Sequence, residues 1–404
     1  MSSHADAEEG VGPTTIRGYD PFAPGVIADP YPWYRWLHQQ APCHYVPERD
    51  VWVISRYDDV VAAARNHGVF SSGEGIGYGR QGNLSLISRD PPKHTRLRRL
   101  VTRDFLPRTV ATLRPRIEAI VAGLVEAMLQ QGRADWETEL SEPLPMIVVA
   151  EMLGIPVERR TDFKRWSDDL IAGMGADLDE TTSGRIEEST VELVAFLRQT
   201  IAERRTHPTP DPVDLISRLV QASDADGLTE GELVSFCVLL IVAGNETTTS
   251  ALSSQVMMAI EHPDQWQLVV RDALLLPAFV EESLRYGSPV QGVFRNTLAT
   301  VEVAGTKVPA GAKLLVLFGA ANRDPDHYRD PDTFLVARNP VDHVAFGSGI
   351  HFCLGAPLAR LELDIVGQAL REKIGRLVPA GEIVPAANPF FRRLRHLPVL
   401  VEAR

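Results

Sequence analysis

The sequence predicts a mainly α-helical protein with small β-sheets. A helical pattern dominates from residue 90 to about residue 285, and the strand-like runs are short and lie on either side of it. No repeat or convincing linker divides the 404-residue chain. We therefore expect residues 1–28, rich in Gly, Pro and acidic residues, to form a flexible arm, and residues 29–404 to form a single domain.

The expected elements begin with an amphipathic helix over 31–40. A β-hairpin follows, with strands 43–46 and 51–56 around the turn 47–50. Glycines then crowd residues 73–82, but their spacing misses the phosphate-binding G-x-G-x-x-G pattern, so we expect a loop there. Asp90, placed before two prolines, indicates the start of a helix.

The longest predicted helix starts at Thr229, where Glu232 completes a capping box, and ends near Glu261, before His262-Pro263. At a rise of about 1.5 Å per residue it would span about 48 Å, which is enough to cross a whole domain. Strands are expected over 293–296, 301–303 and 313–318. A helix over 354–377 then precedes a β-rich tail.

Charge and cysteine usage exclude several classes. The net charge of −12 argues against nucleic-acid binding, and the amino terminus has no secretory signal pattern. The most apolar stretch, 234–244, is well short of the ~20 residues of a membrane span, so we expect no membrane and a cytoplasmic location. The three widely spaced cysteines, Cys43, Cys237 and Cys353, cannot form a disulfide framework and fit a reducing compartment.

Cys353 lies in the most informative segment, Phe346-Gly-Ser-Gly-Ile-His-Phe-Cys-Leu-Gly355, a glycine-flanked loop that ends at a helix start. Free backbone N–H groups there would lower the pKa of the thiol, and a thiolate is the ligand that a soft metal or a haem iron requires. Gly349 and Gly355, which have no Cβ, would let the backbone approach a flat macrocycle. By this chain's composition, F-x-x-G-x-x-x-C-x-G is expected by chance only about 0.0006 times, so an ordinary buried cysteine is a poor alternative.

Glu246 and Thr247 interrupt an apolar stretch of the long helix. A carboxylate and a hydroxyl in such a place must be hydrogen-bonded or must face a wet cavity. Zinc-protease, zinc-ribbon, P-loop and α/β-hydrolase motifs do not occur in the sequence.

The cysteine loop resembles the haem-binding loop of the cytochromes P450, the haem-thiolate monooxygenases. Further segments resemble that family in the same order, from about residue 29 to the carboxyl terminus. They are the cation-rich segment 90–99, the oxygen-activation motif 243–248, the E-x-x-R of 282–285, and Arg338 as the third partner of that pair.

The resemblance implies a cytochrome P450 fold with haem b buried between the long central helix and the cysteine-loop helix. It implies Cys353 as the axial ligand of the iron and Glu246 with Thr247 as a proton relay, beside a Gly244 that loosens the helix. It gives Glu282, Arg285 and Arg338 a bracing role under the loop. The other implied haem-binding residues are His94, Arg98, Arg295 and His351 at the propionates, with Phe346, Gly349, Gly355, Ala243 and Gly244.

The implied reaction is insertion of one atom of dioxygen into a small hydrophobic or aromatic molecule, by hydroxylation or oxidative demethylation. A ferredoxin or flavodoxin with its NAD(P)H reductase would supply the electrons to a monomeric enzyme. A peroxide-driven hydroxylase and a non-catalytic haem sensor stay open as alternatives, although the Glu246-Thr247 pair argues against both. The implied substrate pocket comprises the segments 75–86, 170–174, 242–247 (with Val242, Ala243 and Thr247), 290–293 (with Val290 and Val293) and 390–391 (with Phe390).

Two sets of arginines are candidates for partner contacts. Arg80 and Arg392 could meet a substrate carboxylate, against the alternative of solvated surface arginines. In the second set, the arginines that are not turned to the propionates are expected to form a basic patch on the thiolate side that docks an acidic redox protein, against the alternative of an ordinary solvated face. This set comprises Arg96, Arg98, Arg99, Arg103, Arg108 and Arg360.

Overall fold

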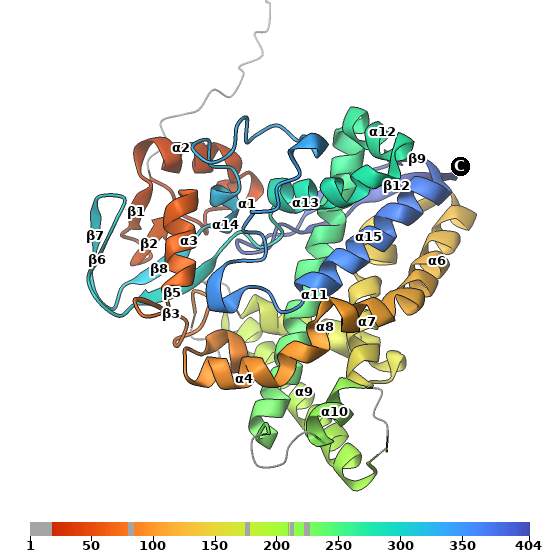
Figure 1. The fold of residues 1–404 in the computed structure, drawn as a ribbon, viewed down its shortest axis with the longest axis horizontal. Helices are drawn as coiled ribbons and strands as arrows, with labels where there is room; N and C mark the ends of the chain where they lie inside the picture. Colours follow the sequence, from red (N-terminus) through yellow and green to blue (C-terminus); the bar gives the residue numbers. More distant parts are fainter. Residues whose placement is uncertain (1–17, 80–84, 174–177, 209, 211–213, 222–226) are drawn as a thin grey trace, which may run out of the picture.

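The computed structural model describes residues 18–79, 85–173, 178–208, 210, 214–221 and 227–404. A helix-rich part and a smaller sheet-rich part lie on opposite sides of the molecule (Figure 1). The helices are α1 (Pro24–Ala28), α2 (Tyr31–Gln40), α3 (Tyr57–Arg65), α4 (Lys93–Thr102), α5 (Pro107–Val110), α6 (Arg114–Gln131), α7 (Pro143–Leu153), α8 (Arg160–Ala172), α9 (Glu180–Thr206), α10 (Leu215–Gln221), α11 (Glu230–Glu261), α12 (Pro263–Arg271), α13 (Leu276–Gly287), α14 (Phe318–Ala321) and α15 (Ala356–Lys373).

The strands form small sheets rather than one continuous sheet. The largest has the order β1-β2-β8-β5-β3, a second has the order β4-β12-β9, and β6-β7 and β10-β11 are two-stranded. The strands are β1 (Cys43–Val46), β2 (Val51–Ile54), β3 (Phe70–Ser71), β4 (Arg133–Asp135), β5 (Val293–Thr297), β6 (Val301–Val303), β7 (Thr306–Val308), β8 (Lys313–Val316), β9 (Ile374–Pro379), β10 (Val384–Pro385), β11 (Leu394–His396) and β12 (Pro398–Ala403).

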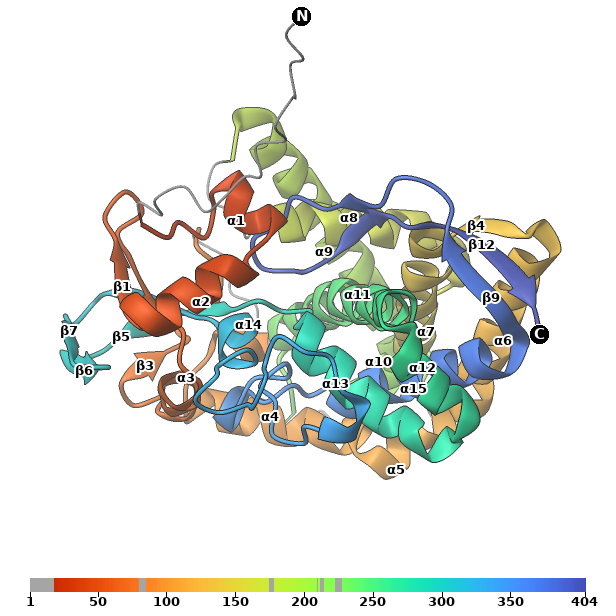
Figure 2. The same ribbon diagram turned by 90° about the horizontal axis from the view of Figure 1, so that it is seen from above.

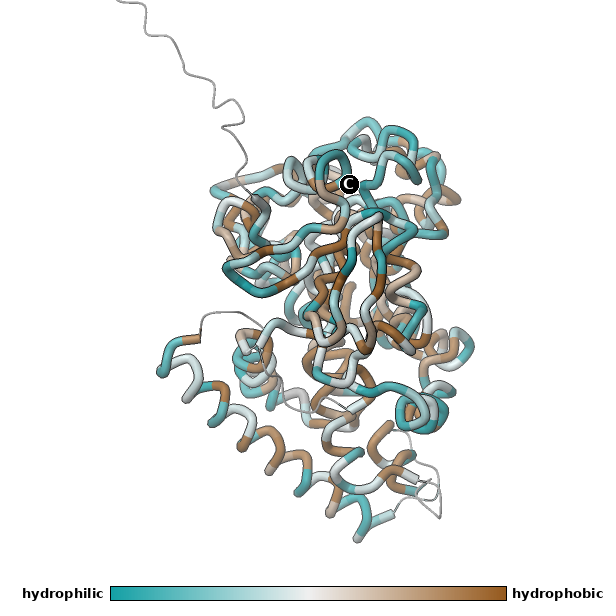
Figure 3. The backbone as a smooth tube through the Cα atoms, turned by 90° about the vertical axis from the view of Figure 1, so that its left-hand side faces the viewer, coloured by the Kyte–Doolittle hydropathy of each residue, from teal (hydrophilic) through white to brown (hydrophobic). Residues whose placement is uncertain are grey.

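Helix α11 is the central element and runs through the middle of the molecule, where Figure 2 shows it almost end-on. Its start is the predicted capping box: the Glu232 amide donates to Thr229 Oγ1 at 3.2 Å, and the Thr229 amide donates to Glu232 Oε2 at 3.0 Å. Apolar side chains surround it, and the hydropathy view shows hydrophobic segments gathered inside the molecule (Figure 3). The predicted start and end of this helix are confirmed.

Within the described ranges, α11 is also the one helix that is long and apolar enough to cross a membrane. However, 72% of its most apolar window is buried inside the protein. Because a buried core helix meets the same criterion, this observation is weak evidence for a membrane span.

Two predicted boundaries are wrong. The helix after Cys353 ends at Lys373 instead of residue 377, because the following residues pair as β9 with β12. The packed chain begins earlier than residue 29, since Tyr19 and Val26 are buried and 24–28 form α1. Of the predicted arm, residues 1–17 lie outside the described part of the chain.

Candidate functional site: a thiol-lined apolar cavity

The loop that carries Cys353 is held in a fixed shape before α15 begins. The Cys353 amide donates to the Phe346 carbonyl at 2.9 Å, and Gly349 has a left-handed φ of +71°. A Cβ on Gly349 would lie 2.6 Å from the carbonyl oxygen of Ala64, at the end of α3. Gly349 therefore permits the loop to pack against α3. It does not line the cavity described next, whereas Gly355 does.

Cys353 opens onto a cavity of about 270 Å³ between the cysteine loop and α11. The predicted residues Val242, Ala243, Gly244 and Thr247 line it from α11. Predicted lining residues from other segments are Val290, Val293, Phe346, Gly355 and Phe390. Further apolar residues, which the sequence did not indicate, line the cavity from several helical segments: Phe105, Met152, Leu153, Phe236, Leu239 and Leu240.

Burial and nearby positive groups have opposite effects on the pKa of the Cys353 thiol. Burial raises the pKa of this thiol above its usual value, and this effect outweighs the lowering by the Gly355 and Ala356 amides and by Arg98. The expected lowering of the pKa is therefore wrong for the protein alone. A thiolate at this position needs a positive partner inside the cavity, as a bound iron would provide.

Basic side chains gather at one end of the cavity. Arg98, Arg295 and His351 line it, and the ring of His94 lies 4.6 Å from the ring of His351. Burial first, and then Arg295, His94 and Arg98, lower the pKa of His351 to about 2. Burial also lowers the pKa of Arg295 to about 10.

The same end of the cavity contains unsatisfied donors. His94 is 3% exposed, and neither of its ring nitrogens has a hydrogen-bond partner. A buried polar group without a hydrogen-bond partner lowers the stability of the fold, unless a bound ligand supplies the missing partner. The residues therefore fit a flat apolar group that carries carboxylates at one edge and a metal at its centre, which is the chemistry of haem. Within the described ranges, no cluster of three or more His, Cys, Asp or Glu side chains offers another metal site.

Sequence reasoning missed two residues beside these cations. Ser72 Oγ lies 3.1 Å from His351 Nε2, and His67 contributes to the low pKa of His351. Both lie in the segment around β3, far from the predicted motifs along the chain. No sequence signal indicated either residue, because only the folded chain brings this segment close to His351.

Thr247 and Glu246 point in different directions. Thr247 lines the cavity, and its hydroxyl donates to the Ala243 carbonyl at 2.7 Å. Glu246 is 6% exposed, does not line the cavity and pairs with Arg393. Gly244 was expected to loosen the helix, but it lies within a continuous helix. A Cβ at this position would come within 2.9 Å of Val149 on α7, so the glycine allows α11 and α7 to pack closely.

Glu282, Arg285 and Arg338 lie together as predicted. The side chains of Glu282 and Arg285 are both 0% exposed, with Arg285 Nε 2.7 Å from Glu282 Oε2. Arg338 Nε donates to Glu282 Oε1 at 3.2 Å. Arg285 also donates to backbone carbonyls of the segment that leads to the cysteine loop, namely those of Asn322, Pro331 and Thr333.

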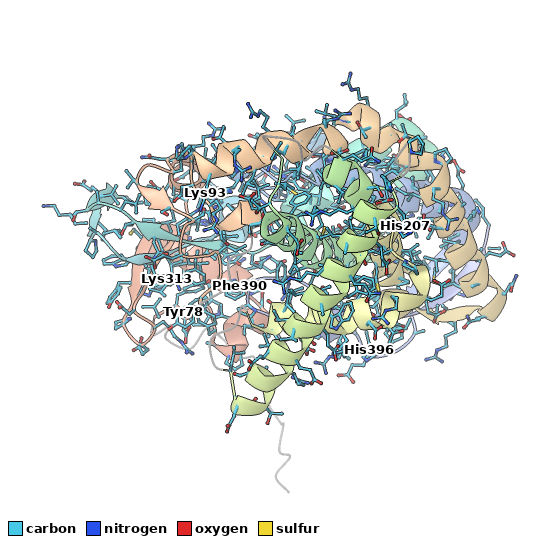
Figure 4. The ribbon with its side chains drawn as sticks, turned by 90° about the horizontal axis from the view of Figure 1, so that it is seen from below. Tyr78, Lys93, His207, Lys313, Phe390 and His396 are labelled. Carbon is cyan, nitrogen blue, oxygen red and sulfur yellow. The ribbon has the colours of Figure 1, made fainter. Side chains whose placement is uncertain are left out.

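Of the two arginines proposed to meet a substrate carboxylate, Arg392 does not line the cavity. Arg392 faces away from the cavity, because Nη1 donates to the carbonyls of Ile27 and Ala28 at 3.0 Å and the guanidinium lies over Tyr31. Arg80 and Met174 lie outside the described residues, and residues 170–173 do not line the cavity. Figure 4 labels Phe390 together with Tyr78 and Lys313, which lie nearby on the sheet-rich side.

Comparisons with known proteins agree with this geometry. The family model for cytochrome P450 matches residues 29–370. The chain is 39% identical to the cytochrome P450 monooxygenase PikC of Streptomyces venezuelae, with 92% of this chain and 91% of PikC covered. It superposes on CYP109Q5 of Chondromyces apiculatus with a TM-score of 0.86 at 37% identity, covering 96% of this chain and 98% of that one.

A second structural relative is CYP109E1 of Bacillus megaterium in complex with testosterone. It has a TM-score of 0.86 and 34% identity, covering 94% of this chain and 99% of that one. The matched region includes the thiol loop, the central helix and the buried Glu–Arg–Arg cluster. The chain therefore belongs to the cytochrome P450 family and is a haem b-dependent monooxygenase.

Proposed function

We propose that this enzyme oxidises a neutral, apolar small molecule by hydroxylation or oxidative demethylation, with electrons from a ferredoxin or flavodoxin and its NAD(P)H reductase. The observation that carries the substrate class is the lining of the cavity. Beyond the cation-rich end, the described lining residues are apolar except for Thr247, Thr248 and Ser348. An ionised substrate would lose its hydration in such a cavity without gaining a partner.

Haem, when bound, supplies the activation of dioxygen, and the chain supplies the surroundings. Cys353 is the proposed ligand of the iron. His94, Arg98, Arg295 and His351 are the proposed donors to the propionates, since they are the basic side chains that gather at one end of the cavity. Ala243, Gly244 and Phe346 would contact the flat faces, and the remaining apolar lining would exclude water and orient the substrate.

The proposed proton donors to dioxygen are Thr247 and Glu246. Thr247 is already in the cavity wall, where its hydroxyl can hold a water molecule. Glu246 must leave Arg393 before it can serve, because its carboxylate lies outside the cavity. A peroxide-driven enzyme or a haem sensor would have little use for this pair.

Part of the predicted basic patch is available to a redox partner. Arg99, Arg103 and Arg108 are exposed and form no ion pair within the described ranges. Arg96 pairs with Glu232, and Arg360 pairs with Glu281 at 2.6 Å, so these two are neutralised. We propose that the three free arginines dock an acidic redox protein.

We further propose that the enzyme is a monomer and that it is cytoplasmic. Its three unpaired cysteines support the location, because they fit a reducing compartment.

The experiment that tests the substrate class is a binding screen of neutral apolar compounds against their carboxylate analogues. We expect the neutral compounds to shift the spin state of the haem and the carboxylates to bind at least about tenfold more weakly, equivalent to about 1.4 kcal/mol. Tighter binding of the carboxylates would contradict the proposal.

A further inference from the structure

Glu281 lies directly before Glu282 on α13 but has partners of its own. Its Oε2 lies 2.9 Å from His343 Nε2, and Arg360 of α15 donates to the carboxylate twice, from Nε at 2.6 Å and from Nη2 at 2.8 Å. The side chain of Glu281 is 14% exposed. Burial raises the pKa of Glu281, but the hydrogen bonds and charges of Arg360 and His343 lower it to about 2. The carboxylate is therefore ionised at neutral pH.

His343 connects this carboxylate to the cysteine loop. The Ala345 amide donates to His343 Nδ1 at 3.2 Å, so Nδ1 carries no hydrogen and Nε2 is the nitrogen that donates to Glu281. In this arrangement the imidazole is neutral. His343 therefore orients Glu281 and adds no charge, which leaves Arg360 as the cation that balances the carboxylate.

Arg360 brings its charge close to the thiol. It lies on α15, the helix that follows Cys353, and its guanidinium carbon is 4.5 Å from the centre of the Phe346 ring. Phe346 lines the cavity, and its carbonyl accepts the hydrogen bond of the Cys353 amide. Burial raises the pKa of the Cys353 thiol, and the charges of Arg98 and Arg360 are among the effects that lower it. The charge of Arg360 therefore acts on the sulfur across the Phe346 ring.

We propose that Glu281 is a positioning residue that offsets the charge of Arg360 beside Cys353 and thereby lowers the reduction potential of the haem-loaded enzyme. His343 holds the carboxylate in place for this purpose. The inference rests on the proposed function, because it takes Cys353 to be the ligand of the iron.

The size of the effect follows from the position of the pair. Reduction adds one electron, so a positive charge nearby favours the reduced form and a negative charge disfavours it. Because the side chain of Arg360 is 37% exposed, water and salt screen its charge. We therefore expect the loss of one member of the pair to change the equilibrium constant for reduction about fivefold, equivalent to about 40 mV for one electron.

The test is a spectroelectrochemical titration of the haem-loaded enzyme and its variants at about 0.1 M ionic strength. Glu281→Gln should favour reduction about fivefold, because Arg360 loses its partner, and Arg360→Gln should disfavour it by a similar factor. The double variant, which lacks both charges, should return to within about twofold of the wild type. Arg360→Lys, which keeps the positive charge, should also stay close to the wild type.

Arg114→Gln is the matched control. Arg114 pairs with another carboxylate of α15, Asp364, at 2.6 Å, and its side chain is also 37% exposed. Asp364 lies about 6 Å further along α15 than Arg360, at a rise of about 1.5 Å per residue, so the charge effect on Cys353 should be weaker. We expect the equilibrium constant for reduction to change by less than about twofold in this variant.

A structural role alone would give a different pattern. Single variants that shift the potential in the same direction, or a double variant that shifts by their sum, would overturn the proposal, as would single variants that both stay within about twofold of the wild type. If Glu281→Gln does not take up haem, the two Arg360 variants provide the measurement, since this side chain is partly exposed. The reduced carbon monoxide spectrum of each sample identifies which idea fails: without the thiolate band in the wild type, the ligand assignment is wrong and the inference falls with it.

Discussion

Replacement of Arg285 by Gln tests whether the buried Glu–Arg–Arg cluster braces the fold under the haem loop. The change removes a cation whose side chain is 0% exposed and leaves the equally buried Glu282 with fewer partners. Glu282 would keep only Arg338, at 3.2 Å, and the Leu335 amide, at 2.9 Å.

The expected loss of stability follows from these contacts. Removing one partner of a buried ion pair costs about 3–5 kcal/mol, because the other charge stays buried without compensation. The carbonyls of Asn322 and Pro331, now 2.7 and 2.9 Å from Arg285 Nη1, would also lose their donor. Since the free energy of unfolding of a protein is about 5–15 kcal/mol, Arg285→Gln should remove a large fraction of it.

The assay is urea unfolding of the haem-loaded variants, followed by tryptophan fluorescence. Arg338→Gln, which leaves the Glu282–Arg285 pair intact, should lose about 1–3 kcal/mol and provides a measurement if Arg285→Gln does not fold. Arg376→Gln is the matched control: its pair with Glu402 is 57% and 55% exposed, so it should lose no more than about 1 kcal/mol. Equal losses in Arg285→Gln and Arg376→Gln would refute the bracing role.

Three further outcomes are expected. Thr247→Ala should retain haem and substrate binding but form less product and more hydrogen peroxide per reduced cofactor consumed. An unchanged yield of product per reduced cofactor would show that the Thr247 hydroxyl only bonds the Ala243 carbonyl of its own helix. Charge reversal of Arg99 and Arg103 should slow reduction of the enzyme by its redox partner and weaken the dependence of that rate on salt, as measured by stopped flow. A wild-type reduction rate that does not change with ionic strength would contradict docking by charge. Burial alone would raise the pKa of Glu281, but Arg360 and His343 lower it to about 2, so its stabilising contribution is present above about pH 4.5 and is lost as the pH falls towards 2. Glu281→Gln should therefore lose less stability than the wild type between about pH 5 and about pH 3 in urea unfolding.

Most of the fold followed from local chemistry in the sequence. The capping box of Thr229 and Glu232 set the start of α11, and apolar alternation around a short turn set the β1–β2 hairpin. The end of α15 was missed because it depends on the pairing of Ile374–Pro379 with β12, which a local helical pattern does not contain. The packing of residues 18–28 was missed for a related reason, since Tyr19 and Val26 are buried against distant segments.

The site was predictable where a motif is local. Cys353 came from a short pattern and the basic residues from the family resemblance, and the structure brings Arg98, Arg295 and His351 into one cavity with Cys353. The direction of Glu246 was not predictable, because its partner Arg393 lies 147 residues along the chain. The role of Gly349 was not predictable either, because the close contact that requires a glycine there is made with α3, which is distant along the chain.

Cys353 is proposed to provide the thiolate that binds the haem iron. The most direct measurement is the absorption spectrum of the reduced carbon monoxide complex in the wild type, Cys353→Ser and Cys43→Ser. Cys43 is a buried cysteine of strand β1, away from the cavity, and serves as the control. We expect the strongly red-shifted band of thiolate-ligated haem in the wild type and in Cys43→Ser, and its loss in Cys353→Ser. Persistence of that band in Cys353→Ser would contradict the assignment.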